Sequence, residues 1–146
     1  MDNIVIDGVI ITPLKQILNP KGDILHGLKK SDQGYSNFGE AYFSSINYND
    51  IKPWKKHHLM TLKLIVPVGT IRFVLFDNRE FSKSKGIYNE FTLSKNNYCR
   101  LTIPPGIWFA FKGENIGLNL LLNIADIEHS PTEIERLELN DIHYNW

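Results

Sequence analysis

The residues most able to do chemistry stand together in the segment 52–58, KPWKKHH, directly before an apolar run. Lysines such as Lys55 bind phosphate, and Trp54 could stack on a base or a sugar ring. An imidazole exchanges protons near neutral pH. Because neighbouring strand residues point to opposite faces, only one of His57 and His58 can face the interior of a barrel. The segment predicts the rim of a ligand pocket or, alternatively, a solvated loop whose tryptophan folds onto the core.

A metal site built from a His-x-His pair, a glutamate and a later histidine does not fit this chain. His57 and His58 are adjacent, no acid lies between His58 and Gly69, and the position three residues after Gly106 is Phe109. A first-row metal needs about three such ligands on one face. We therefore expect no bound metal.

Two further polar residues stand where a pocket could use them. Asn123 interrupts the apolar run 118–124, and a buried amide must either bond to the protein or face a ligand. His129 comes directly before a Ser-Pro pair, where it is either exposed or part of a pocket. Both remain candidates on these grounds.

An aromatic run and a charged pair have structural as well as functional interpretations. Trp108 follows the rigid turn 104–106 and begins the run WFAF, which indicates either core packing or the aromatic wall of a cavity. Asp77 and Arg79 close an apolar run, and we expect an ion pair there at the end of a strand.

The elements that must position these residues are short strands. Apolar runs recur every 8–12 residues with turn-forming residues between them, which is typical of a β-sandwich or closed barrel. The candidate strands are 4–11, 40–47, 60–68, 71–77, 90–93, 98–103, 108–111 and 118–124, with a hairpin turn at Gly69-Thr70. The expected core includes Leu64, Val66, Val74, Leu101, Leu120 and Leu122. The segment 130–133, SPTE, predicts a capped helix over 131–137.

Composition and charge exclude several functions. The 146 residues suit one domain, and 16 basic against 16 acidic residues leave no net charge to attract nucleic acid or an anionic membrane. Cys99 is the only cysteine, so no intrachain disulfide forms. The N-terminal residues lack the basic start of a signal peptide, and no apolar run approaches the ~20 residues of a membrane span. We expect a single cytoplasmic domain, residues 1–146, that binds neither nucleic acid nor membrane.

Several of these segments, taken in order, resemble the dTDP-4-dehydrorhamnose 3,5-epimerases, a cupin family that has shorter relatives in surface-polysaccharide gene sets. Lys21-Gly22-Asp23-Ile24 is similar to the family's Arg-Gly-x-Phe, and Trp54-Lys55-Lys56-His57 to its Arg-Gly-Leu-His. The segments 77–79, 82–86, 93–94 and 103–106 resemble its Asp-x-Arg, Ser-Pro-Thr-Phe-Gly, Leu-Ser and Ile-Pro-x-Gly motifs. The segment 130–133 resembles its Ser-Pro-x-x-Glu. The resemblance covers most of the chain.

The resemblance implies an all-β cupin fold, a double-stranded β-helix jelly roll, here with a short C-terminal helix. It also implies a homodimer in which N-terminal strands cross to the partner. The family inverts carbons beside the C4 ketone of a nucleotide-linked sugar, with a histidine base, a tyrosine acid and no cofactor. Its base position falls on His57, with His58 as the rival, and a second site tyrosine falls on His129. Lys63 lies near a family lysine, and Lys21 and Lys55 are placed to hold the diphosphate.

This chain departs from the family pattern at three places. The acid tyrosine falls on Asn123, which cannot donate a proton at neutral pH. The later histidine is Phe109, and the C-terminal section that supplies the acidic partner of the base is short, with Asp126 as one candidate replacement. We therefore expect a divergent epimerase that binds its substrate through Lys21, Trp54, Lys55, Lys63, Trp108 and Asn123. The alternatives are a non-catalytic module that binds a sugar nucleotide or glycan, and a nucleotide-sugar 3,4-ketoisomerase.

Overall fold

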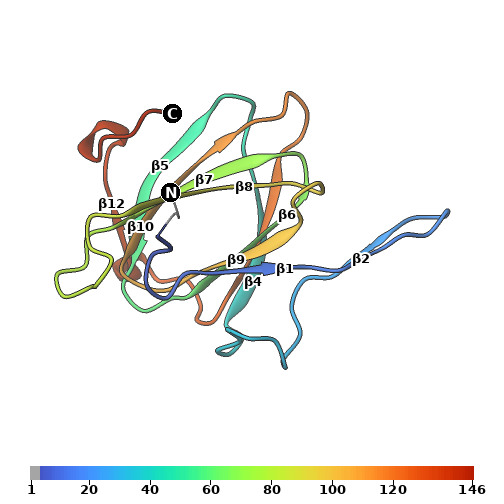
Figure 1. The fold of residues 1–146 in the computed structure, drawn as a ribbon, viewed down its shortest axis with the longest axis horizontal. Helices are drawn as coiled ribbons and strands as arrows, with labels where there is room; N and C mark the ends of the chain where they lie inside the picture. The colour runs from blue at the N-terminus through green and yellow to red at the C-terminus, as the bar shows by residue number, and fades with distance from the viewer. Residues whose placement is uncertain (1–3) are drawn as a thin grey trace.

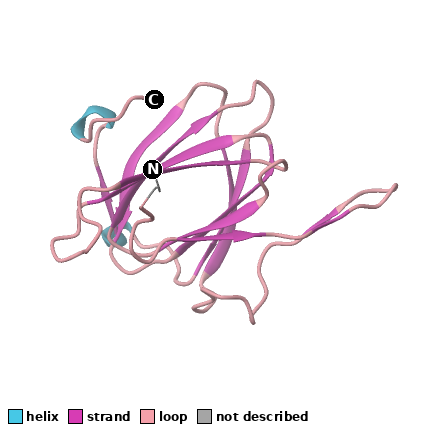
Figure 2. Ribbon diagram, viewed as in Figure 1, coloured by secondary structure: helices cyan, strands magenta, loops and turns pink. Residues whose placement is uncertain are grey.

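Two antiparallel sheets face each other in the computed structural model, which describes residues 4–146 (Figures 1 and 2). The first, called the β4 sheet, has the order β1 (Ile10–Pro13), β9 (Cys99–Ile103), β6 (Leu62–Val68), β11 (Leu120–Ala125) and β4 (Glu40–Ser45). The second, the β5 sheet, has the order β12 (Ile134–Arg136), β5 (Ile51–His57), β10 (Ile107–Gly113), β7 (Ile71–Asp77) and β8 (Tyr88–Leu93). This arrangement confirms the predicted all-β jelly roll.

The chain passes between the sheets at most of its turns, which corrects the predicted hairpin at Gly69-Thr70. β6 belongs to the β4 sheet and β7 to the β5 sheet, so the two strands do not pair. Gly69 has a φ of +79°, and a Cβ on it would lie 2.3 Å from the carbonyl oxygen of Leu118. The turn is therefore a tight crossing between facing sheets.

The core lies between the two sheets and contains three of the six residues expected there. Leu64, Val66 and Leu101 are buried between the sheets, whereas Val74 is buried on the outer face of the β5 sheet. β6 is buried on both faces because the segment 26–38 covers its outer side, where Gly27 approaches Ile65. A strand that is covered on both faces has a nearly continuous apolar sequence, as β6 does.

The expected register of β11 is wrong by one residue. Leu121, Asn123 and Ala125 are buried, while Leu120 and Leu122 are half-buried on the other face. The pairing of β11 with β6 also shifts register between Leu120 and Leu122. A run of three leucines has no alternation, so the sequence could not indicate which face turns inward.

The helix expected over 131–137 is absent. Pro131–Glu133 forms a single 3-10 turn, η1, and Ile134–Arg136 continues as strand β12, which pairs with the end of β5. Pairing with β5 at the edge of the sheet satisfies backbone groups of these three residues, so the chain need not continue as a helix. The expected strand 4–11 is displaced along the chain, because β1 covers Ile10–Pro13 and overlaps the expectation only at Ile10 and Ile11.

Two segments extend the sandwich beyond its sheets. β2 (Gln16–Ile17) and β3 (Ile24–Leu25) form a hairpin that projects away from the body of the protein, here called the arm (Figure 1). At the other end of the chain, after η2 (Leu139–Asp141), Ile142 packs on the outer face of the β5 sheet with Tyr144 and Trp146. No helix within residues 4–146 is long and apolar enough to cross a membrane.

Candidate active site

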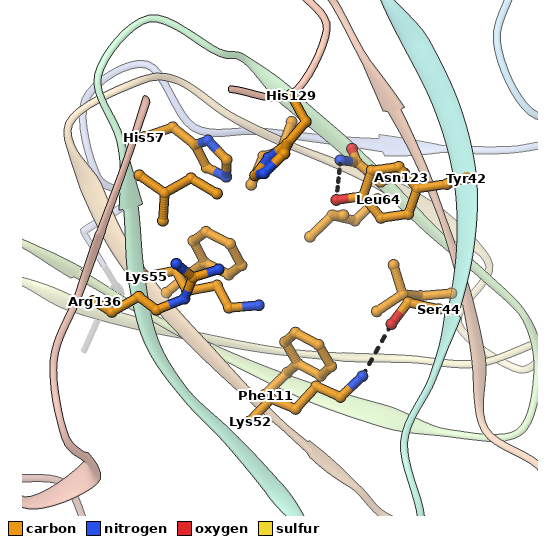
Figure 3. A pocket seen from close by; sticks show the side chains of 14 residues that line it. Tyr42, Ser44, Lys52, Lys55, His57, Leu64, Phe111, Asn123, His129 and Arg136 are labelled. Carbon is orange, nitrogen blue, oxygen red and sulfur yellow. Dashed lines mark hydrogen bonds between the residues drawn. The ribbon is translucent and has the colours of Figure 1, made fainter. Parts of the chain in front are cut away.

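A cavity of about 150 Å³ opens between the two sheets (Figure 3). The buried side chains of His57, Leu64, Phe109 and Asn123 form its floor, and the exposed residues Tyr42, His129 and Arg136 stand at its mouth. The remaining lining residues are Ser44, Lys52, Lys55, Leu62, Phe111, Leu121 and Ile134. A cavity with apolar and aromatic walls and a few convergent polar groups is typical of a ligand site.

His57 is the base candidate that faces this cavity. It ends β5, is 6% exposed, and stacks on Phe109 with ring centroids 6.1 Å apart and planes inclined by 11°. His58 points the other way, is about half exposed, and lies 3.7 Å from Glu135. The expectation that only one of the two histidines can face inward therefore selects His57.

Glu133 stands behind His57 as a buried carboxylate. Its Oε1 lies 3.6 Å from His57 Nδ1 and accepts hydrogen bonds from the backbone N–H groups of Leu59 (2.8 Å) and Met60 (2.7 Å). These two bonds fix the carboxylate at the turn between β5 and β6. Because Nδ1 faces this acceptor, the imidazole turns Nε2 towards the cavity.

Glu133 is the functional residue that sequence reasoning missed. The helix cap that SPTE predicts would hold the carboxylate at its own turn, but η1 has no side-chain cap and the carboxylate points inward. Asp126, the proposed acidic partner, instead accepts from the backbone N–H of Thr61 and from Ser36. A signal that could have found Glu133 was its likeness to the glutamate of the family's Ser-Pro-x-x-Glu motif, which in this chain lies one residue closer to the Ser-Pro pair.

The two partners are poised for base chemistry at neutral pH. Burial lowers the pKa of His57, the charge of Glu133 partly offsets this, and Lys55 and His129 lower the pKa further. Burial opposes ionisation of Glu133, but the bonds from Leu59 and Met60 outweigh it and lower the pKa of the carboxyl. A neutral imidazole thus sits against an ionised carboxylate.

Cations line one side of the cavity. Lys52 donates to Ser44 Oγ (3.0 Å) and to the carbonyl of Ser45 (2.8 Å). Lys55 and Arg136 form no ion pair with any carboxylate among residues 4–146. Burial lowers the pKa of Lys55, and the charges of Arg136 and Lys52 add to this effect. Uncompensated cations at the mouth of a cavity form a site for an anion.

Two polar residues on the opposite side are bonded to each other. Asn123 is 1% exposed, and its Nδ2 donates to the hydroxyl of Tyr42 at 3.1 Å (Figure 3). Its Oδ1 accepts from the backbone N–H of Lys63 at 3.3 Å. His129 is held by a bond from its backbone N–H to Glu40, and its ring lies beside His57 at the cavity.

The structure brings together His57, His129, Lys55 and Asn123, but it places the other four expected residues elsewhere. Trp54 and Trp108 are buried on the outer face of the β5 sheet, because each lies an odd number of positions from an inward residue. Lys63 is buried on the outer face of the β4 sheet and donates to Ser36. Lys21 lies in the exposed turn of the arm. Lys21, Trp54, Lys63 and Trp108 therefore do not line this cavity within one subunit.

The Asp77–Arg79 pair is structural, as its strand-end position indicated. Asp77 is fully buried and accepts hydrogen bonds from Arg79, Ser82 and Ser84. These bonds overcome the effect of burial and hold the pKa of the carboxyl far below its usual range. Together these four side chains stabilise the turn that leads into β8. No three metal-ligating side chains cluster anywhere in the part of the chain that the structure describes.

Three known proteins are informative relatives. A dTDP-sugar isomerase from Desulfovibrio desulfuricans G20 is 38% identical, with 92% of this chain and 87% of that chain covered and a TM-score of 0.90. The dTDP-4-dehydrorhamnose 3,5-epimerase of Sulfolobus tokodaii is 21% identical, covering 98% and 84%, with a TM-score of 0.84. The spore coat polysaccharide biosynthesis protein SpsL of Bacillus subtilis is 24% identical over 145 residues, 97% of this chain and 96% of SpsL. No family model matches the chain.

Proposed function

Because the chain belongs to the family of the dTDP-sugar isomerase of Desulfovibrio desulfuricans, we propose that it is a cofactor-independent epimerase of a nucleotide-linked 4-keto-6-deoxy sugar. One observation carries the proposal. A neutral histidine lies on the floor of an apolar cavity with a buried carboxylate 3.6 Å behind it. A general base needs a low enough pKa to be unprotonated at neutral pH and a partner that fixes its tautomer.

The ketone determines which bond the base can break. A proton beside a carbonyl is acidic because the electron pair left behind spreads onto the carbonyl oxygen as an enolate. In the proposal, His57 Nε2 removes this proton, and Glu133 stabilises the imidazolium that forms. His129, beside His57 at the mouth of the cavity, donates a hydrogen bond to the enolate oxygen.

The cations supply the binding energy for the nucleotide part. The cavity holds about 150 Å³, which is room for a sugar ring but not for a whole nucleotide sugar. The diphosphate must then lie at the mouth, where Lys55 and Arg136 have no carboxylate partner among the described residues, with Lys52 close by. Bonds between such cations and phosphate oxygens are about twice as strong as neutral hydrogen bonds.

A homodimer is part of the proposal. The arm projects from the body and exposes apolar residues, with Leu18 80% and Ile24 56% exposed. An unpaired apolar hairpin of this kind is a liability unless another chain covers it. We propose that the arm crosses to a partner subunit and carries Lys21 towards the partner's cavity, where it adds a cation for the diphosphate.

The relatives suggest the biological setting. SpsL is named for spore coat polysaccharide biosynthesis, and the Desulfovibrio protein for a dTDP sugar. We propose accordingly that the product sugar enters a surface polysaccharide and that the enzyme works in the cytoplasm. Thymidine diphosphate is the nucleotide to test first.

The decisive experiment follows deuterium in heavy water. The protein is incubated with dTDP-4-keto-6-deoxyglucose, and NMR reports deuterium entry and inversion at the carbons beside the ketone. Wild type should do both, and His57→Asn should lose both by a factor on the order of 10² or more. The matched control, His58→Asn, should stay near wild type because His58 faces away from the cavity. Tight binding of the nucleotide sugar without any exchange would instead support a binding module. A shift of the ketone to C3 would indicate a ketoisomerase.

A further inference from the structure

Epimerisation needs a proton donor on the face of the sugar opposite the base. If the base returned its own proton, the carbon would keep its configuration. His57 belongs to the β5 sheet, so the donor must reach the ring from the side of the β4 sheet. On the proposed function, we infer that this donor is the hydroxyl of Tyr42.

Topology leaves few other candidates among the cavity residues that carry a transferable proton. Lys55 and Arg136 are paired neighbours on β5 and β12, the same side as His57. His129 is held through its backbone by Glu40, but its ring lies next to that of His57 (Figure 3), so we assign it to the side of the base. Only β4 supplies proton-bearing side chains from across the cavity, namely Tyr42 and Ser44 (Figure 3).

Hydrogen bonding distinguishes these two. Ser44 Oγ accepts a hydrogen bond from Lys52 and lies at the cation end of the cavity, away from His57 (Figure 3). Tyr42, which pairs with Asn123 across the β4–β11 ladder, places its hydroxyl on the floor of the cavity. Its ring approaches from the mouth, so the hydroxyl can meet a sugar ring bound between it and His57.

The buried amide of Asn123 fixes which way the Tyr42 hydroxyl points. Asn123 Oδ1 accepts from the backbone N–H of Lys63, so the amide must present its Nδ2 protons to Tyr42. The hydroxyl oxygen is therefore the acceptor of that bond, and its own proton has no acceptor among residues 4–146. The proton is left to point into the cavity, and the amide stabilises the negative charge that grows on the oxygen as the proton leaves. Asn123 is thus a positioning residue.

The step balances without a cofactor. His57 takes the proton from one face, and the C–H electron pair becomes the enolate. The enolate pair then forms a new C–H bond with the Tyr42 proton on the opposite face, and the O–H pair stays on the tyrosine oxygen. Solvent returns a proton to Tyr42 and removes the one held by His57, so both groups are reset.

The test separates the two faces of the reaction in heavy water. In Tyr42→Phe, His57 still removes the proton, exchanges it with solvent and returns deuterium to the same face. The variant should therefore label the substrate at nearly the wild-type rate, while formation of the epimer falls by a factor on the order of 10² or more. The control Tyr48→Phe, an exposed tyrosine outside the cavity, should leave both rates unchanged.

Thermal unfolding of each variant confirms that it is folded. Three outcomes would overturn the inference. Normal epimer formation by Tyr42→Phe would exclude Tyr42 while the proposed function stands. Loss of inversion with retained labelling in His129→Gln, but not in Tyr42→Phe, would assign the donor to His129. Absence of both labelling and inversion in the wild-type protein would reject the epimerase and its donor together.

Discussion

Glu133→Gln separates the electrostatic effect of the buried carboxylate from its part in folding. Glu133 faces His57 at 3.6 Å and accepts two backbone hydrogen bonds from the β5–β6 turn. Glutamine keeps the shape and an acceptor oxygen, so the turn should remain in place. What the substitution removes is the negative charge behind the base.

The size of the effect follows from the distance. Two unit charges 3.6 Å apart attract by about 1 kcal/mol at the dielectric constant of water and by about 5 kcal/mol at an effective value near 20. The lower end applies here, because the N–H groups of Leu59 and Met60 already neutralise part of the carboxylate. Glu133 raises the pKa of His57 against the effect of burial, so its neutralisation lowers that pKa. The acidic limb of kcat/KM, which reports the base of the free enzyme, should move to lower pH by about one unit.

The same change slows the reaction at its plateau. A less basic imidazole accepts a proton less readily, and no charge is left to stabilise the imidazolium, so kcat/KM should fall by about 10- to 100-fold. The assay is epimer formation by NMR from about pH 5 to about pH 9. The control is Glu135→Gln, an exposed glutamate that pairs with Lys56 at 2.8 Å and faces away from the cavity. An acidic limb that stays in place, or a plateau equal to wild type, would show that Glu133 serves only the fold.

Two predictions concern the scaffold. Asp77→Asn should lower the free energy of unfolding by about 2–4 kcal/mol at pH 7, because it removes the buried charge that binds Arg79 and two serines. The loss is limited because Arg79 remains partly solvated. The pKa of Asp77 is lower in the folded protein than in the unfolded chain, where it is near 3.9. The stability that Asp77 contributes is therefore present above about pH 3.9 and is lost as the pH falls through the pKa of the folded protein. Urea titrations should therefore show a gap between wild type and variant that narrows below about pH 4, and a constant gap would contradict the assignment. For the arm, sedimentation velocity at micromolar concentration should show a wild-type dimer and a monomeric Leu18→Asp, Ile24→Asp double variant. A wild-type monomer would exclude the proposed dimer.

Much of the fold could be predicted because its strands are short apolar runs separated by turn residues. Prediction failed where the pattern lost its period. Leu120 to Leu122 carry no alternation, so the inward face of β11 could not be chosen. The lysine-rich segment 52–58 predicts a pocket rim or a solvated loop, yet most of it is strand β5. Its Lys52 and Lys55 reach the cavity, whereas Trp54 faces outward.

The site was predictable in part for a related reason. Alternation predicts that only one of His57 and His58 faces inward, and the family resemblance favours His57. Alternation also places Trp54 on the face opposite His57, because three positions separate them. Apart from the resemblance of the segment 130–133 to a family motif, nothing local could reveal Glu133, and nothing local could reveal Tyr42. Each gains its meaning from a partner on another strand or turn, namely His57 for Glu133 and Asn123 for Tyr42. Such contacts across the fold are set by tertiary structure, not by the sequence around each residue.

The fold itself tolerates His57 poorly. Its Nδ1 is buried, and its nearest acceptor, Glu133 Oε1, lies 3.6 Å away, beyond hydrogen-bond distance, so the group is incompletely bonded at a cost of up to about 1–3 kcal/mol. A leucine at this position would avoid that cost and pack on Phe109. Glu133, by contrast, is retained by two backbone bonds whatever chemistry the cavity performs. A relative that no longer catalyses the reaction would therefore lose the histidine early and keep the glutamate. Relatives with both residues should be active enzymes, and relatives with only the glutamate should be inactive.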